Sequence, residues 1–234
     1  MVLKSCRTMT TLLIGRNFRG EIMPQDENID GFGNLQVLDI SGCLLSGNIP
    51  QWISRLKNLE MLILSANRLT GPIPGEISPI IGQLEVHVLD FSFNNLSGKI
   101  PQSICNLTNL QVLHLSNNHL TDAIPPGLSN LHFLSAFNVS NNDLEGPIPT
   151  GGQFDTFPDF SFRGNPKICS PIVARRCNST EEALTSPIST KQYIDKTVFV
   201  IAFGVSFGVG VVYDQIVVSR FLQSLRLRLV CPLE

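Results

Sequence analysis

The sequence predicts an α/β-type solenoid whose repeats each add one short strand to a parallel ladder on a concave face, followed by one C-terminal transmembrane helix. Two observations support it: an apolar frame that returns about every 24 residues, and a long uncharged run near the C-terminus. With 234 residues, 43% of them hydrophobic, the chain is long enough to bury a sizeable core. We expect a degenerate repeat with an insertion (1–34), five repeats (35–149), a C-terminal cap (150–177), a linker (178–196), a transmembrane segment (197–218) and a cytosolic tail (219–234).

The repeating frame is L-x-x-L-x-L-x-x-N-x-L, and most copies continue with G-x-I-P. Its copies begin at Leu35, Leu59, Val86, Leu110 and Leu134. The aliphatic positions point into a shared core, and the strand of each repeat lies beside the same strand of the next. The Asn, replaced by Cys43 in the first copy, can bond otherwise unpaired backbone groups along the stack, and the Pro ends the strand. This frame and period are the signature of leucine-rich repeats. With its G-x-I-P continuation, the frame resembles the plant extracellular type of these repeats.

The period slips in three places. The step from Asn67 to Asn94 is 27 residues, which predicts a small loop or junction within 75–87. Upstream, residues 11–22 resemble a degenerate repeat. After Pro149 the period stops, and four aromatic residues are expected to close the last repeat as a cap. They are Phe154, Phe157, Phe160 and Phe162.

Candidate binding residues lie at the variable positions of the strands, because the frame residues are occupied with packing. Outward side chains at equivalent positions of stacked strands form columns on the concave face. The predicted ligand-binding residues are Asp39, Ser41, Ile63, Asp90, His114 and Asn138. A serine recurs two residues after the outward residue of each strand, and these serines form a second column. An alternative interpretation is that these serines are only small polar residues that fit a crowded face.

The membrane segment is predicted from 17 consecutive uncharged residues at 197–213. They span about 26 Å as a helix, at the short end of what crosses a bilayer. Arg220, Arg226 and Arg228 follow, which favours a cytosolic C-terminus. Asp214 is the weak point of this prediction, because the run could instead be a buried strand or an out-of-frame remnant.

Four N-glycosylation sequons precede this segment and none follows it. They lie at Asn95, Asn106, Asn138 and Asn178. Their distribution favours an extracellular domain in a single-pass plasma-membrane protein, although residues 1–17 show no signal peptide.

Several function classes have no support. A net charge of -2 provides no basic surface for nucleic acid. No CxxC or His-x-x-x-His spacing indicates a metal site, and no cofactor is expected. The histidines lack a nucleophile and an acid arranged around them, so we expect no enzyme.

The N-x-L-x-G-x-I-P repeats, the string at 141–154 and the string at 162–169 resemble plant leucine-rich-repeat receptor-like proteins and receptor kinases, closest to the tyrosine-sulfated peptide (phytosulfokine-type) receptors. The resemblance implies a plasma-membrane receptor whose ectodomain binds a secreted peptide, a co-receptor kinase or both. It also implies a disulfide between Cys169 and Cys177.

The chain departs from this family in its tail, which has no kinase motifs, and in lacking the family's peptide-binding island between repeats. Signalling is therefore expected in trans, through a partner. Two alternatives stay open: a truncated receptor-kinase copy without activity of its own, and a soluble inhibitor of a wall-degrading enzyme like the plant polygalacturonase inhibitors.

Overall fold

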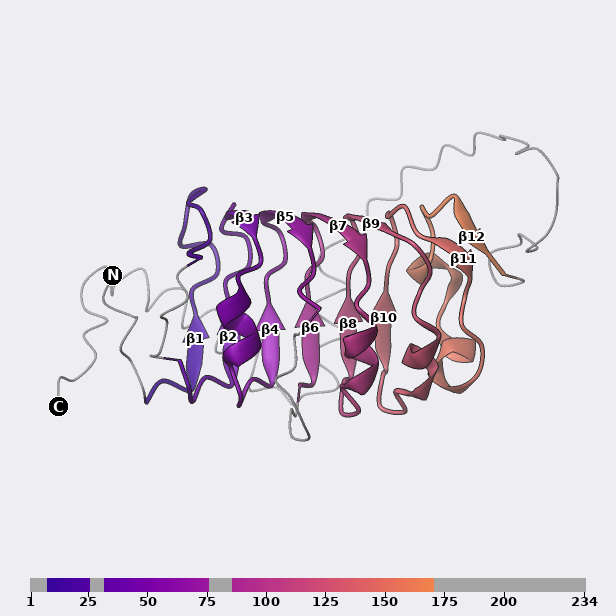
Figure 1. Cartoon of the computed structure of the whole chain (residues 1–234), viewed down its shortest axis with the longest axis horizontal. Helices are drawn as coiled ribbons and strands as arrows, with labels where there is room; N and C mark the ends of the chain where they lie inside the picture. Colours follow the sequence, from indigo (N-terminus) through magenta and orange to yellow (C-terminus); the bar gives the residue numbers. More distant parts are fainter. Residues whose placement is uncertain (1–7, 26–31, 76–85, 171–234) are drawn as a thin grey trace. The chain divides into compact units, whose positions relative to one another are not determined.

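The computed structural model describes residues 8–25, 32–75 and 86–170. The predicted linker, transmembrane segment and tail lie outside these residues. The described part is a solenoid built on a six-stranded parallel sheet (Figure 1). Its strands, in spatial order, are β1 (Thr11–Leu13), β2 (Val37–Asp39), β4 (Met61–Ile63), β6 (Val88–Asp90), β8 (Val112–His114) and β10 (Ala136–Asn138).

A second ladder runs along another level of the coil (Figure 1). It contains β3 (Ser46–Asn48), β5 (Arg68–Pro72), β7 (Asn95–Lys99) and β9 (His119–Thr121), and a separate pair joins β11 (Glu145–Pro147) to β12 (Lys167–Cys169). The parallel-ladder solenoid predicted from the repeat is thus confirmed.

The helical component differs from the α/β-type expectation, since every helix in the described ranges is a 3-10 helix. They are η2 (Gln51–Arg55), η3 (Gln102–Asn106), η4 (Pro126–Asn130), η5 (Gly152–Thr156) and η6 (Asp159–Ser161). Pro50, Pro101 and Pro125 immediately precede the first three. Because each repeat already spends residues on two strands, the remaining connection has room for about one tight helical turn, which the 3-10 form supplies.

The longer step between the second and third repeats does not interrupt the ladder. Met61 of β4 pairs directly with Val88 of β6, as Val37 pairs with Met61 one repeat earlier. The loop or junction predicted within 75–87 falls largely outside the described residues. Residues 11–22 do contribute a turn of the coil: β1 pairs with β2, and Ile22 bridges Ser46.

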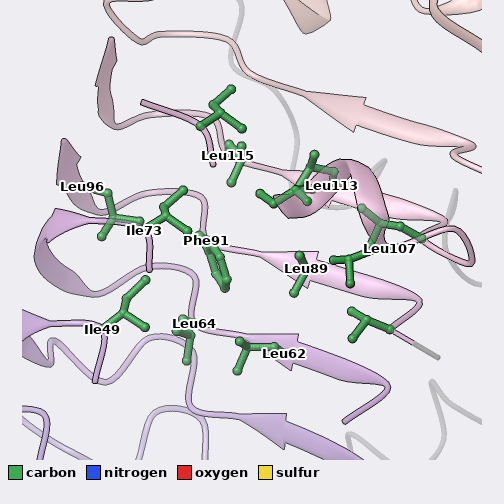
Figure 2. Packing of buried hydrophobic residues seen from close by; sticks show 14 of the residues in the cluster. Ile49, Leu62, Leu64, Ile73, Leu89, Phe91, Leu96, Leu107, Leu113 and Leu115 are labelled. Atoms are coloured by element: carbon green, nitrogen blue, oxygen red, sulfur yellow. The ribbon is translucent and has the colours of Figure 1, made fainter. Parts of the chain in front are cut away.

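The core is a set of parallel rows, one row for each apolar position of the frame. Figure 2 shows Leu62, Leu89 and Leu113 in one such row, pointing inward from successive strands. All three are fully buried. Burying a leucine side chain stabilises a fold by about 1.5–3 kcal/mol, so each row carries a large share of the stability.

A ladder of asparagines, all buried except the half-buried Asn94, runs parallel to these rows. Asn118 accepts a hydrogen bond on Oδ1 from the Leu96 amide (3.0 Å) and donates from Nδ2 to the carbonyls of Phe91 (3.0 Å) and Leu115 (3.1 Å). It thus bonds its own repeat and the previous one at once. The same pattern holds at Asn67, Asn94, Asn142 and Asn165.

Asn165 shows that the coil makes one turn more than the sequence analysis expected. Its Oδ1 accepts from the Leu144 amide at 3.1 Å, as the ladder asparagines before it do. The frame reappears as Phe157-x-x-Phe160-x-Phe162-x-x-Asn165, 23 residues after Asn142. It was missed because phenylalanine replaces every aliphatic residue and the step is one residue short.

Aromatic packing closes this end of the core. The rings of Phe154, Phe157 and Phe162 lie 4.9, 5.4 and 5.7 Å from that of Phe137, centroid to centroid. Phe160 was expected to join them, but its side chain is 56% exposed. It lies within η6 (Asp159–Ser161), and no described contact draws its ring into the cluster.

We expect Asn118→Ala to lower the free energy of unfolding by about 3 kcal/mol, because it leaves buried backbone groups of two repeats without partners. Urea unfolding followed by circular dichroism measures the change. Asn130→Ala, at an exposed position, is the matched control and should cost far less. Equal effects of the two substitutions would show that the ladder does not hold the repeats together.

Candidate functional site: the ladder face

The outward face of the six-stranded sheet, here called the ladder face, brings the predicted binding residues into one column. Strand pairing aligns Asp39 with Ile63, Ile63 with Asp90, Asp90 with His114, and His114 with Asn138. Residues next to each other in this column lie on neighbouring strands, about 4.8 Å apart. The geometric part of the prediction is therefore correct, whereas a role in binding stays a proposal.

Three side chains of this column share one conformation. Oδ1 of Asp39, Asp90 and Asn138 accepts a hydrogen bond from the backbone amide two residues later, at 2.9, 3.0 and 2.9 Å. They come from β2, β6 and β10, so they alternate with Ile63 and His114 along the column. The bond fixes each side chain in one orientation on the face.

The serine column divides into two parts. Ser41 and Ser65 are half-buried, whereas Ser92, Ser116 and Ser140 are buried. Ser92 also donates from Oγ to Oδ1 of Asp90 at 2.6 Å. For the buried three, the geometry favours the interpretation that a small residue fits a crowded face.

His114 differs from the rest of its column because only 8% of it is exposed, whereas Asp39, Ile63, Asp90 and Asn138 are half-buried. Burial lowers the pKa of His114 below its ordinary 6.5, and the neighbouring Asp90 carboxylate opposes this by raising it. The imidazole is therefore held mainly in its neutral form inside the column.

An apolar column runs beside this one. It consists of Val37, Met61, Val88, Val112 and Ala136. Within the described repeats, neither this column, nor the column from Asp39 to Asn138, nor the serine column contains Lys or Arg. The middle of the ladder face thus combines an apolar stripe with carboxylates that have no Lys or Arg beside them in these columns; the neighbour of Asp90 is His114.

A further column was missed by the sequence analysis. The residue before each ladder position has a positive φ, including 55° at Ala66, 55° at Phe93, 57° at Asn117 and 55° at Asn141. Asn tolerates this conformation, whereas a bulky side chain is strained in it. Phe93 is nevertheless 59% exposed, so its ring gains little from core packing. The signal was available, since this is the residue just before each frame Asn.

The predicted modification sites have separate surroundings. Asn95 is exposed on β7 and Asn106 is exposed at the end of η3, whereas Asn138 is half-buried on the ladder face. Cys169 is disulfide-bonded, but Cys177 lies outside the described residues, as does Asn178, so the Cys169–Cys177 pairing stays a prediction. Cys43 and Cys105 are free thiols.

The described residues contain no group of three or more His, Cys, Asp or Glu side chains that could hold a metal ion. Among the helices of these residues, none is long and apolar enough to cross a bilayer.

The similarity of this chain to known proteins lies in its repeats. The Leucine Rich Repeat family model matches residues 34–56, 58–80, 85–107 and 109–131. The crystal structure of the BIR2 ectodomain from Arabidopsis thaliana is 33% identical, with a TM-score of 0.56 over 64% of this chain and 77% of that one. This chain belongs to the plant leucine-rich-repeat receptor-like proteins. The resemblance stated above is confirmed.

Other members of the family are similar over shorter stretches. Receptor-like protein 3 of Arabidopsis thaliana is 45% identical over 71 residues (29% of this chain), and Phytosulfokine receptor 1 of the same plant is 39% identical over 66 (28% of this chain). The aligned part covers only 9% and 6% of these two relatives. The HAESA ectodomain of Arabidopsis, solved with the peptide hormone IDA, is 32% identical with a TM-score of 0.52, over 64% of this chain and 28% of that one.

We expect Phe93→Asn to raise the free energy of unfolding by about 1 kcal/mol, because Asn relieves the strain at a positive φ that Phe bears without burial. Phe160→Asn replaces a similarly exposed ring at a position without a positive φ, so it should give no such gain. Urea midpoints of both variants provide the comparison, and a destabilised F93N would contradict the strain argument.

We also expect acid to weaken the fold through His114. Its pKa is lower folded than unfolded, so the unfolded chain binds more protons as the pH falls from 6.5 toward the folded pKa, and the free energy of unfolding decreases across this window. His114→Gln cannot take up that proton. Unfolding curves at pH 7 and pH 5 should therefore show a larger loss in the natural chain than in H114Q, and equal losses would exclude His114 as the source.

Proposed function

We propose that this chain is a membrane-anchored receptor-like protein whose leucine-rich-repeat domain binds a secreted peptide or a partner receptor kinase on the ladder face. The observation that carries the proposal is the face itself: a continuous sheet of in-register strands whose outward residues lie outside the main hydrophobic cluster. The HAESA ectodomain, which shares this fold, was solved with a peptide hormone bound.

Anchoring is proposed through residues 197–218, with 178–196 as a linker and 219–234 as a cytosolic tail. The basic residues Arg220, Arg226 and Arg228 support this orientation. Residues 219–234 contain no kinase motif, and we propose that a partner receptor kinase supplies the catalytic step.

The two roles considered for Asn138 exclude each other. A glycan on its side chain would stand on the ladder face among the residues proposed to meet a ligand. We therefore assign glycosylation to the exposed Asn95 and Asn106, with Asn178 as a further candidate, and reserve Asn138 for the ligand.

The test is a glycosidase-induced mobility shift of the chain expressed from its own start codon in plant cells, because N-glycans are added only in the secretory lumen. We expect Asn95→Gln and Asn106→Gln each to reduce the mobility shift by the contribution of one glycan, whereas Asn138→Gln leaves the shift unchanged. An unglycosylated chain would contradict export and, with it, the receptor assignment.

Membrane fractionation tests the anchor separately. Deleting residues 197–218 should move the protein from the membrane fraction to the soluble or secreted one. An unchanged distribution would rule out this segment as the anchor.

A further inference from the structure

The spacing of the carboxylates on the ladder face selects one kind of peptide conformation. Asp39 on β2 and Asp90 on β6 are separated by one strand, β4, which places them about 9.6 Å apart. Asn138 on β10 continues the same two-strand step. A polyproline II chain has three residues per turn with a rise of about 3.1 Å, so its side chains return to one side every 9.3 Å or so. A β-extended chain returns every two residues, about 6.7 Å, and falls out of step.

The carboxylates of Asp39 and Asp90 are each held in one orientation and remain accessible to a ligand. One oxygen of each accepts an amide bond from Ser41 or Ser92, which fixes the carboxylate against the face. Both side chains keep part of their surface exposed. Ile63 lies between them and offers no competing charge.

The charge of the face is one-sided. Arg16 lies at the β1 end, with its side chain over Gly42, and Arg163 lies beyond β10, where Asp159 neutralises it at 2.6 Å. Between these two positions the outward columns carry aspartate and no Lys or Arg. An acidic peptide would be repelled here, and a basic one attracted.

The apolar column from Val37 to Ala136 runs parallel to the column of Asp39 and Asp90. Val37, Met61 and Ala136 of this column are half-buried, whereas Val88 and Val112 are only 7% and 6% exposed. A polyproline II peptide lying across the strands would therefore meet carboxylates with one row of side chains, and the accessible apolar residues of this column with the next. Proline rings fit such a stripe and hold the conformation at low entropic cost.

We propose that the ladder face binds a cationic peptide in the polyproline II conformation, running across the strands, with basic residues at positions i and i+3 paired with Asp39 and Asp90. Position i+6 then meets Asn138. This inference rests on the proposed function, and it narrows the ligand to a class opposite in charge to a tyrosine-sulfated peptide.

The first experiment measures fluorescence anisotropy of two synthetic peptides on the full chain. Both contain two arginines and the same prolines; one has the arginines three positions apart, the other two. We expect the first to bind more tightly and to lose about two- to fivefold in affinity with either Asp39→Asn or Asp90→Asn. Asparagine retains the Oδ1 acceptor for the serine amide, so the fold is preserved. Because both substitutions create an N-x-Ser sequon, all variants are produced in a host without N-glycosylation. Asp143→Asn, exposed and outside these columns, is the control.

Equal binding of the two peptides, or binding that ignores both aspartates, would overturn the inference. A parallel selection from a random twelve-residue peptide display library separates it from the proposed function. Enrichment of basic residues at i and i+3 would support both. Enrichment of neutral or acidic peptides would overturn the inference and leave peptide binding standing. The absence of any enriched peptide would count against both the inference and peptide binding, and would favour a partner receptor kinase as the ligand.

Discussion

The side-chain amide of one buried asparagine per turn is the interaction on which the rest of the structure depends. Where the backbone leaves each strand, amides and carbonyls of two adjacent turns point inward without strand partners. Asparagine has an acceptor and two donors on one short side chain, so it can satisfy groups of both turns together. Asn118 does this at distances of 3.0–3.1 Å, bonding Leu96, Phe91 and Leu115. The bonds set the step between turns and thereby the register of both ladders.

The first repeat shows what happens without that amide. Cys43 occupies the ladder position, and its Sγ lies 3.4 Å from the carbonyls of Ile14 and Ser41. A thiol is a weak donor and a weak acceptor, so it holds the β1 turn less firmly than asparagine holds the others. The amides of Cys43 and Leu45 are satisfied instead by Asn67 of the following turn. The asparagine ladder thus tolerates one weak member, because each asparagine also bonds backbone groups of the turn before it.

Much of this architecture could be predicted, since a fixed period converts sequence position directly into spatial position. The alignment of Asp39, Ile63, Asp90, His114 and Asn138 needed only the frame and the pleat of a strand. Features that depend on the neighbouring turn could not be read in the same way. His114 is only 8% exposed although the other residues of its column are half-buried, and the repeat frame does not encode this difference. The last turn was missed because Phe157, Phe160 and Phe162 occupy the aliphatic positions of the frame.

Different residues stabilise the fold and form the ladder face, which explains how one scaffold can carry a specific surface. Because the asparagines and the apolar rows hold the turns together, outward residues are free to vary without loss of the fold. Asp39 and Asp90 add a refinement, since the bond from each Oδ1 to the amide two residues later orients the carboxylate before any ligand arrives. A side chain that is already ordered loses little further entropy on binding, so more of its charge interaction appears as affinity. The distance between strands then selects among ligands. A peptide whose side chains return to one side at two strand spacings can contact every oriented side chain together.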